Sequence, residues 1–540
     1  MAAPSRRKKW SFINILLTVL ALLIGGVTWL TLSHHRDAVA ARGDRGHGVH
    51  RLMGAGADPA ELEWEPRVYE SETFPPPKPR PPAPLSAKIR GAEKALEAAV
   101  AAAKQRIEAA AAPDDGDRSR RVHVVFSTDC TPYQDWQSEV VFNSADVVGH
   151  KGPVTRIASG CKDGREEKLR ARYAQLYGEH SRFSMHVTPE FNKDEKTGKA
   201  YHFYNKPRGI EHFLESGGVD FAGAPIVALI DPDFAFLRPL TDVVERETAL
   251  LIKPWTKEEL PAFVDEGHPV GQQYGLGTHW LTFDREKICG AGSPCLSTDS
   301  KDAYKYYPVG PPYVMHHADW RRLAPVWRDF APKVYAQYPD LLAEMYAYCM
   351  AAAHLRLRHA RVNHMMLSNV HVQDEGWAHL DARPLEDACP ARRYDAPRIV
   401  ADALDGTAGP APRLPTFLHY CQNYRLGEYM FAKRRVPPKL FTDCAHPFLE
   451  EPTLAIHALD YELHPPGNPC REQPARHDVP KRVRNRTAAV VCLATWHANA
   501  AAKRARETTC AAAAPPPDPV RIFTLATTCA KGVAAFHSNG

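Results

Sequence analysis

The stretch "GAPIVALIDPDFAFLRPL", Gly223 to Leu240, combines a buried strand with two carboxylates. The apolar run from Ala224 to Ile230 stops at Asp231 and Asp233 and then resumes. A short, continuous apolar run bounded by turn residues is typical of a strand buried on both faces. Two desolvated anions repel each other, so the pair needs a compensating cation or strong hydrogen bonds. The stretch therefore predicts a buried strand that ends in a charged site.

Strand and helix patterns alternate before this stretch. A first strand is predicted at Val122–Phe126, followed by a helix in "PYQDWQSEVVFNSADVVG" and a second short strand within Gly152–Ser159. "NKPRGIEHFLES" predicts another helix, with Asn205 as its N-cap and Pro207 in its first turn. This alternation predicts an α/β fold with a doubly wound, mainly parallel sheet, whose ligands bind beyond the carboxyl ends of the strands.

The N-terminal region predicts a membrane anchor. The segment from Phe12 to Leu32 is mostly apolar and uncharged, and its length suits a bilayer-spanning helix. Arg6 to Lys9 precede it, so the positive-inside rule places the first residues in the cytosol and the rest in the lumen. The alternative is a signal peptide cleaved near "AVAA", Ala38 to Ala41, but the apolar segment is long for one. Either reading places the protein in the secretory pathway.

The predicted organisation has five parts. The stem includes a polyproline spacer, "FPPPKPRPPAPL", and an alanine-rich stretch that is either a solvated helix or a low-complexity linker. The predicted parts are a cytosolic tail (1–11), the anchor (12–32), the stem (33–120), a catalytic domain (121–452) and a C-terminal tail of unassigned role (453–540).

Composition excludes some functions and supports a luminal location. A net charge of +5 spread over 540 residues does not indicate nucleic acid as a partner. All 12 cysteines, Cys130 to Cys529, follow the predicted anchor. They form no C-x-x-C pair, so disulfides with some free buried thiols are expected rather than a zinc site. The glycosylation sequon Asn485-Arg486-Thr487 also fits a luminal location.

Asp231 and Asp233 are candidate metal ligands. Side chains at i and i+2 of an extended backbone point the same way, so both carboxylates can hold a manganese or magnesium ion shared with substrate phosphates. The alternative is an ordinary Asp-Pro-Asp turn. Without a cation the two should repel, so neutralising one should hold or raise the stability of the metal-free protein.

Three basic side chains are further candidates. Lys206 and Arg208 lie in the first turn of the helix before the acidic strand, where they either contact phosphates or form a solvated helix face. His419, in "PTFLHYCQNYRLGEYMF", is either a third metal ligand or a structural histidine.

Several blocks of the sequence resemble a known family. "VVFSTDCTPYQDWQ", "GPVTRIASG", "NKPRGIEHFL", "LIDPDFAFLRP", "LLAEMYAYCMAAAH" and "FLHYCQNYRLGEYMF" are similar, in this order, to blocks of the hydroxyproline O-arabinosyltransferases and the related peptidyl serine α-galactosyltransferases. The resemblance spans roughly residues 121 to 452.

The resemblance implies a GT-A-type glycosyltransferase fold, a UDP-sugar donor and four functional elements. Asp231 and Asp233 match the metal-binding acidic motif, and His419 matches the late metal-binding histidine. Gly310, in "YYPVGPPYVMHHADW", matches the glycine loop that lets the backbone approach the donor sugar; a plain turn is the alternative. Glu344, in "LLAEMYAY", matches the acidic residue that begins the helix under the acceptor side, and its apolar neighbours predict partial burial.

The resemblance also implies a function. We expect a single-pass type II enzyme of the Golgi or endoplasmic reticulum that transfers a sugar, arabinose in the favoured reading, from a UDP-sugar to hydroxyproline of a hydroxyproline-rich glycoprotein. The alternatives are a peptidyl serine α-galactosyltransferase and a non-catalytic luminal glycoprotein-binding protein of the same fold. "DPDF" is intermediate between the acidic motifs of the two enzyme branches and leaves the donor sugar open.

The expected reaction is metal-dependent and retains the anomeric configuration. The cation would neutralise charge on the leaving diphosphate. We expect Glu344 to position the acceptor or stabilise the transition state, with Asp233 as the second catalytic carboxylate. The expected donor-binding residues are Asp231, Lys206, Arg208 and Gly310.

Overall fold

The computed structural model describes most of the chain after residue 116. The described residues are 117–178, 181–216, 221–246, 255–373, 375–393, 395–404, 414–464, 475–510 and 519. They all belong to one compact unit, Ala99–Gly540. The predicted cytosolic tail (1–11), the anchor Phe12–Leu32 and nearly all of the stem lie outside the described residues. Within the described residues, no helix combines the length and apolar character needed to cross a bilayer.

A seven-stranded sheet forms the centre, in the order β3-β2-β1-β4-β7-β6-β8. The strands are β1 (Val122–Asp129), β2 (Val154–Ser159), β3 (Phe183–Thr188), β4 (Ile226–Ile230), β6 (Val270–Gln273), β7 (Val309–His316) and β8 (Ala360–Val362). β7 is antiparallel to both of its neighbours, and every other neighbouring pair is parallel. The predicted α/β class and mainly parallel sheet are confirmed.

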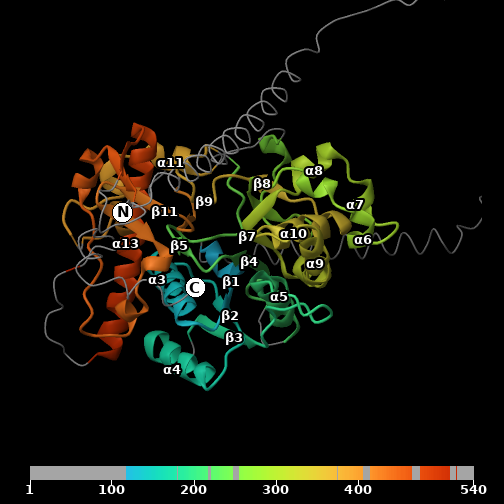
Figure 1. Ribbon diagram of the computed structural model, residues 1–540, viewed down its shortest axis with the longest axis horizontal. Helices are drawn as coiled ribbons and strands as arrows, with labels where there is room; N and C mark the ends of the chain where they lie inside the picture. The colour runs from blue at the N-terminus through green and yellow to red at the C-terminus, as the bar shows by residue number, and fades with distance from the viewer. Residues whose placement is uncertain are drawn as a thin grey trace, which may run out of the picture. The chain divides into compact units, whose positions relative to one another are not determined.

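Helices cover both faces of the sheet (Figure 1). Successive residues of a strand point to opposite faces, so β1 contributes to two hydrophobic cores. Val124 and Phe126 pack with Phe142, whereas Val125 packs with Phe213 and Trp320. The helices of the first face are α3 (Pro132–Val147) and α4 (Arg165–Tyr177), and those of the second are α5 (Asn205–Glu215), α9 (His317–Gln337) and α10 (Ala343–His354).

The start of α5 differs from the prediction. Asn205 is the first helical residue, and Tyr204 occupies the N-cap position. The preceding 3-10 turn, His202–Tyr204, already has helical backbone angles at its end, so the helix needs no side-chain cap there. The Asn205 side chain instead accepts a hydrogen bond from the backbone N–H of Phe191 at 2.9 Å.

A second, three-stranded sheet begins directly after β4. Its strands are β5 (Phe234–Phe236), β10 (Phe417–His419) and β9 (Met366–Leu367). The chain passes from β4 into β5 through Asp231 and Asp233. β10 pairs antiparallel with β5, opposing His419 to Phe234. This pairing brings the late histidine of the sequence to the acidic pair.

The C-terminal helix α13 (Lys481–Thr509) packs against α3 in one hydrophobic cluster. The disulfide Cys389–Cys492 ties it to the preceding region, and Cys444–Cys510 ties its end. The core therefore continues past residue 452, where the sequence predicts the domain to end. The alanines of this helix form a closely packed face.

The described residues contain two further disulfides, Cys130–Cys161 and Cys289–Cys295, and two free thiols, Cys349 and Cys421. The remaining helices are α6 (Arg285–Cys289), α7 (Pro294–Ser297), α8 (Ser300–Tyr306), α11 (Trp377–Asp381) and α12 (Arg398–Leu404). The remaining strands are β11 (Asn423–Leu426), β12 (Tyr429–Ala432), β13 (Tyr461–His464) and β14 (Ala475–Asp478).

Candidate active site

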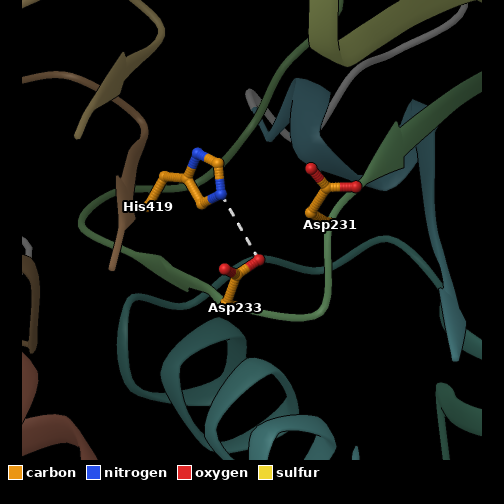
Figure 2. Close-up of side chains that lie close together, drawn as sticks. All are labelled: Asp231, Asp233 and His419. Atoms are coloured by element: carbon orange, nitrogen blue, oxygen red, sulfur yellow. Dashed lines mark ion pairs between the residues drawn. The ribbon is translucent and has the colours of Figure 1, made fainter. Parts of the chain in front are cut away.

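Asp231, Asp233 and His419 converge at the carboxyl end of β4 (Figure 2). One ligand atom from each lies within 4.8 Å of the others. His419 Nε2 is 3.3 Å from Asp233 Oδ1. The backbone N–H of Tyr420 also donates to the carbonyl oxygen of Asp233 at 3.1 Å. The structure therefore brings together the three residues that the sequence singles out as metal ligands.

Aromatic packing fixes the orientation of His419. Its ring stacks on Phe234, with the ring centroids 4.4 Å apart and the planes inclined by 24°. Tyr424 Oη donates a hydrogen bond to the His419 carbonyl oxygen at 3.1 Å, which holds the backbone at the end of β10. Apolar and backbone contacts thus set the ring plane, and one imidazole nitrogen faces the carboxylates.

Each carboxylate of the pair is held by a lysine. Lys206 Nζ lies 2.9 Å from Asp231 Oδ1, and Lys433 Nζ lies 2.5 Å from Asp233 Oδ2. The lysines neutralise the charge that would otherwise drive the two carboxylates apart. The expectation that the pair repels in the metal-free protein is therefore wrong, because these two cations compensate it.

Lys206 also joins the acidic pair to Glu344. Its Nζ lies 2.7 Å from Glu344 Oε1, so the ammonium group bridges Asp231 and Glu344. Glu344 lies in the first turn of α10 and is only 2% exposed, more deeply buried than predicted. Its backbone is fixed from both sides: the N–H donates to Tyr201 Oη at 3.1 Å, and Trp327 Nε1 donates to the carbonyl oxygen at 2.7 Å.

The buried charges shift each other's pKa values. Burial acts to raise the pKa of Asp233, but Lys433 and His419 outweigh it and hold that pKa far below its usual value. Burial acts to lower the pKa of Lys206, and the carboxylates of Asp231 and Glu344 reverse this effect and raise it. Burial raises the pKa of Glu344, with Lys206 opposing the shift. Asp233 and Lys206 are thus charged at neutral pH.

Arg208 is not part of this cluster in the described contacts. It pairs with the exposed Glu195 at 2.7 Å, and its guanidinium lies 5.8 Å from the centre of the Phe191 ring. Residues two apart on a helix point in different directions, so Lys206 and Arg208 cannot share one side of α5. The phosphate contacts predicted for both stay predictions.

Gly310 lies in strand β7, not in a loop. A Cβ atom there would lie 2.3 Å from the Tyr274 ring and 2.6 Å from Met345 Cε. The glycine therefore makes room for packed side chains. The register between β6 and β7 shifts opposite the prolines that follow Gly310, which explains how a "PVGPP" sequence, read as a turn, forms a strand.

Two residues beside the acidic pair, Lys433 and Tyr274, were not predicted from the sequence. Lys433 opens the basic run "KRR" after β12, and this run was the available signal. Tyr274 follows β6; burial raises its pKa, and the negative charges of Asp231 and Asp233 raise it further. Neither residue is close to the acidic pair in the sequence.

Comparisons with known proteins give relatives for part of the chain. No protein-family model matches it. The chain is 26% identical over 269 residues to a peptidyl serine alpha-galactosyltransferase of Arabidopsis thaliana, covering 47% of this chain and 29% of the relative. It is 31% identical over 131 residues to a protein of the same name from Chlamydomonas reinhardtii, covering 24% and 16%. The matches span less than a third of either relative.

Two solved structures of the galactosyltransferase LgtC were also matched, an active-site mutant and a complex with donor and acceptor sugar analogs. Their TM-scores are 0.30 and 0.29, each at 12% identity over 56% of this chain and 87% of the other. The resemblance predicted from the sequence motifs is confirmed by the two curated relatives: this chain is similar to proteins named as glycosyltransferases.

Proposed function

We propose that this protein is a retaining glycosyltransferase that moves galactose from a UDP-galactose donor to the serine hydroxyl of a secreted protein. The observation that carries the proposal is the convergence of Asp231, Asp233 and His419 at the carboxyl end of a strand in a mainly parallel sheet. Ligands of such sheets bind at this edge. Both curated relatives are named for transfer to serine, so the galactosyl alternative is better supported than arabinose transfer to hydroxyproline.

The donor set fits a divalent cation. Two carboxylates and one imidazole nitrogen suit manganese, and the oxygen ligands also suit magnesium. Asp231, Asp233 and His419 would hold the ion. When bound, the cation neutralises charge on the departing diphosphate.

The chain's own residues hold the site in shape. Lys206 fixes Asp231 against Glu344, and Phe234 fixes the ring of His419. Glu344 Oε2 is buried and accepts no hydrogen bond from the described residues. We propose that Glu344 helps to orient the acceptor hydroxyl. A retaining reaction requires no general base opposite the leaving group, so orientation is sufficient.

The remaining parts of the proposal concern fold and location. We propose a GT-A-type arrangement of the catalytic unit, anchored by Phe12–Leu32 as a type II protein of the Golgi or endoplasmic reticulum. The apolar anchor sequence and the disulfides of the described residues support a secretory location, because disulfides persist in oxidising compartments.

The test is a donor and acceptor panel with the purified full chain and manganese. UDP-galactose and UDP-arabinofuranose are each offered to three peptides that differ at one position: serine, hydroxyproline or alanine. We expect galactose transfer to the serine peptide alone, lost in chelator and restored by manganese.

Other results distinguish the alternatives. Arabinose transfer to the hydroxyproline peptide would restore the first expectation from the sequence. Peptide binding without transfer from either donor would support the non-catalytic reading. Full transfer in chelator would contradict the metal site.

A further inference from the structure

A cavity of about 450 Å³ lies where helix α11 meets the first turns of α13. The rest of its lining comes from the chain between Arg383 and Ala388 and from His457. Small-molecule sites in proteins have volumes of roughly 300–1,000 Å³. Among the described residues that line the cavity, none belongs to the candidate active site. A ligand bound there would occupy a second site.

Basic side chains outnumber acidic ones in this lining. The basic residues are Arg383, Lys481, Arg482 and Arg486, and the acidic residue of the described lining is Asp381. Arg486 is buried and pairs with Asp381 at 2.5 Å. Arg383 pairs with Asp387 at 3.2 Å. These pairs leave the charges of Lys481 and Arg482 without a counterion among the described residues.

Lys481 and Arg482 begin α13 and are exposed at the open side of the cavity. Neither side chain forms a hydrogen bond or an ion pair with the described residues. The positive end of the helix dipole lies at this terminus, so two basic side chains in the first turn do not stabilise the helix. Their position is better explained by an anion that they attract.

Two further donors belong to the lining. Asn485 lies one turn after Lys481 on the same side of α13, and its amide forms no hydrogen bond with the described residues. The Nε atom of Arg383 is buried and also has no hydrogen-bond partner among them. Both groups are able to donate a hydrogen bond to an oxyanion.

Apolar side chains complete the lining. Leu380, Ala388 and Ala489 are buried there. An inorganic ion would leave this apolar surface uncovered. A ligand that carries an apolar body beside its charged group would cover it, and burial of that body would add to its affinity.

We propose that this cavity binds a small organic phosphate, with the phosphate at Lys481 and Arg482 and the organic body against Leu380 and Ala489. A phosphate monoester carries about two negative charges at neutral pH, which matches the two cations. Charged donors form the stronger hydrogen bonds to phosphate oxygens. The site shares no residue with the proposed glycosyl transfer and goes beyond that function. A soluble phosphate ester and a lipid headgroup offer the same chemistry.

The sequon Asn485-Arg486-Thr487 lies beside this cavity, and its first two residues line it. Thr487 is buried, and its hydroxyl donates to the carbonyl oxygen of Val483 at 2.8 Å. An N-glycan on Asn485 would fill the cavity, so the proposal requires this asparagine to be unmodified. Peptide mass spectrometry of the full chain from a glycosylating host checks this, and a glycan on Asn485 would overturn the proposal.

The binding experiment is a calorimetric titration of the full chain, in detergent, with phenyl phosphate, inorganic phosphate and phenol. Phenyl phosphate should bind, and the other two should bind at least about tenfold more weakly, because each lacks one half of the ligand. Saturating UDP and Mn²⁺ should leave phenyl phosphate binding unchanged. Dihexanoyl phosphatidic acid, titrated in the same way, identifies a lipid headgroup as the source if it binds more tightly than phenyl phosphate.

The double variant Lys481→Gln, Arg482→Gln should bind phenyl phosphate at least about tenfold more weakly. Its matched control, Lys439→Gln with Lys503→Gln, removes two exposed positive charges outside the cavity and should bind as wild type. Thermal unfolding should give both double variants the melting temperature of wild type, because all four side chains are exposed. If the first double variant does not fold, Arg482→Gln alone replaces it.

Three results of the titrations would overturn the proposal. The first is no binding of phenyl phosphate, and the second is equal affinity in wild type and in the folded variant that lacks the cations. The third is displacement of phenyl phosphate by UDP and Mn²⁺, which would place it in the candidate active site. Equal affinity for inorganic phosphate and phenyl phosphate would overturn the assignment of an organic ligand.

Discussion

The carboxyl end of β4 and the helix α13 are both buried, but they are stabilised in opposite ways. The end of β4 is stabilised by buried ion pairs, in which Lys206 and Lys433 each contact acidic side chains. The second presents a face of small apolar residues, among them Ala488, Val490 and Ala498, and is tied by disulfides.

The difference indicates that the end of β4 is suited to binding charged ligands, whereas α13 contributes mainly to the stability of the fold. Buried charges gain little over well-packed apolar groups, and losing one partner is strongly destabilising. A protein that keeps buried charges is less stable than one with apolar groups there, but it has a site that can bind charged ligands. Apolar burial and cross-linking contribute stability without such a requirement. Substitutions in the two regions should therefore separate activity from stability.

Asp233→Asn should have the largest effect, on both properties. Transfer should fall by about 100-fold or more, as when a key electrostatic group of an active site is removed. The free energy of unfolding should fall by about 3–5 kcal/mol, because Lys433 and His419 lose their shared carboxylate. Activity assays and thermal unfolding measure the two effects.

The exposed Asp395 supplies the control, since Asp395→Asn removes the same charge from a side chain that forms no hydrogen bond or ion pair with the described residues. It should match wild type in both measurements. An Asp233→Asn variant at least as stable as wild type would favour the repulsion expected from the sequence over the charge pairing seen in the structure.

The sequence predicted features that depend on local pattern. The strands β1, β2 and β4 follow from short apolar runs, and the carboxylates of Asp231 and Asp233 follow from their spacing. The ion pairs could not be predicted from the sequence. Lys433 is 200 positions from Asp233, and Lys206 is 138 positions from Glu344, so only the folded chain brings them together.

Two features of the fold were not predicted from the sequence. "PVGPP" was expected to be a glycine loop or a plain turn, but a register shift between β6 and β7 accommodates the two prolines within β7, next to Gly310. The C-terminal tail was assigned no role, but its helix α13 packs against α3. In both cases the deciding contact comes from a segment distant in sequence.

Lys206→Met should have the next largest effect, about 3–5 kcal/mol of unfolding free energy, because Asp231 and Glu344 would face each other without a cation. Adding Glu344→Gln should recover part of this loss by removing one of the two charges. Denaturant unfolding of the wild type, both single variants and the double variant gives the coupling energy. Additive effects in this cycle would show that Lys206 does not bridge the two carboxylates.

On the α13 side, replacing both Cys389 and Cys492 by alanine should lower stability by about 2–4 kcal/mol while transfer below the melting temperature stays near wild type. This disulfide joins residues 103 positions apart, whereas Cys289–Cys295 spans 6. The same double replacement at the short disulfide should cost less, because a short loop restricts the unfolded chain less. Thermal unfolding compares them, and an equal or reversed order would contradict this account.

The smallest effect concerns the pH dependence of α13. His497 is fully buried, and burial lowers its pKa from 6.5 to about 3. The unfolded chain takes up a proton below about pH 6.5 while the folded chain does not, so stability is complete above that pH and declines as pH falls. At pH 5 the loss from this residue should be about 1–2 kcal/mol.

His497→Leu should remove this contribution and flatten the decline in melting temperature between pH 7 and pH 5. Other buried histidines, among them His150 and His359, have pKa values lowered by burial and so keep part of the decline in both proteins. The difference between wild type and variant therefore isolates His497. His371→Leu, a histidine replacement at an exposed position, is the matched control. Parallel curves for wild type and His497→Leu would mean that α13 admits a proton at His497 without unfolding.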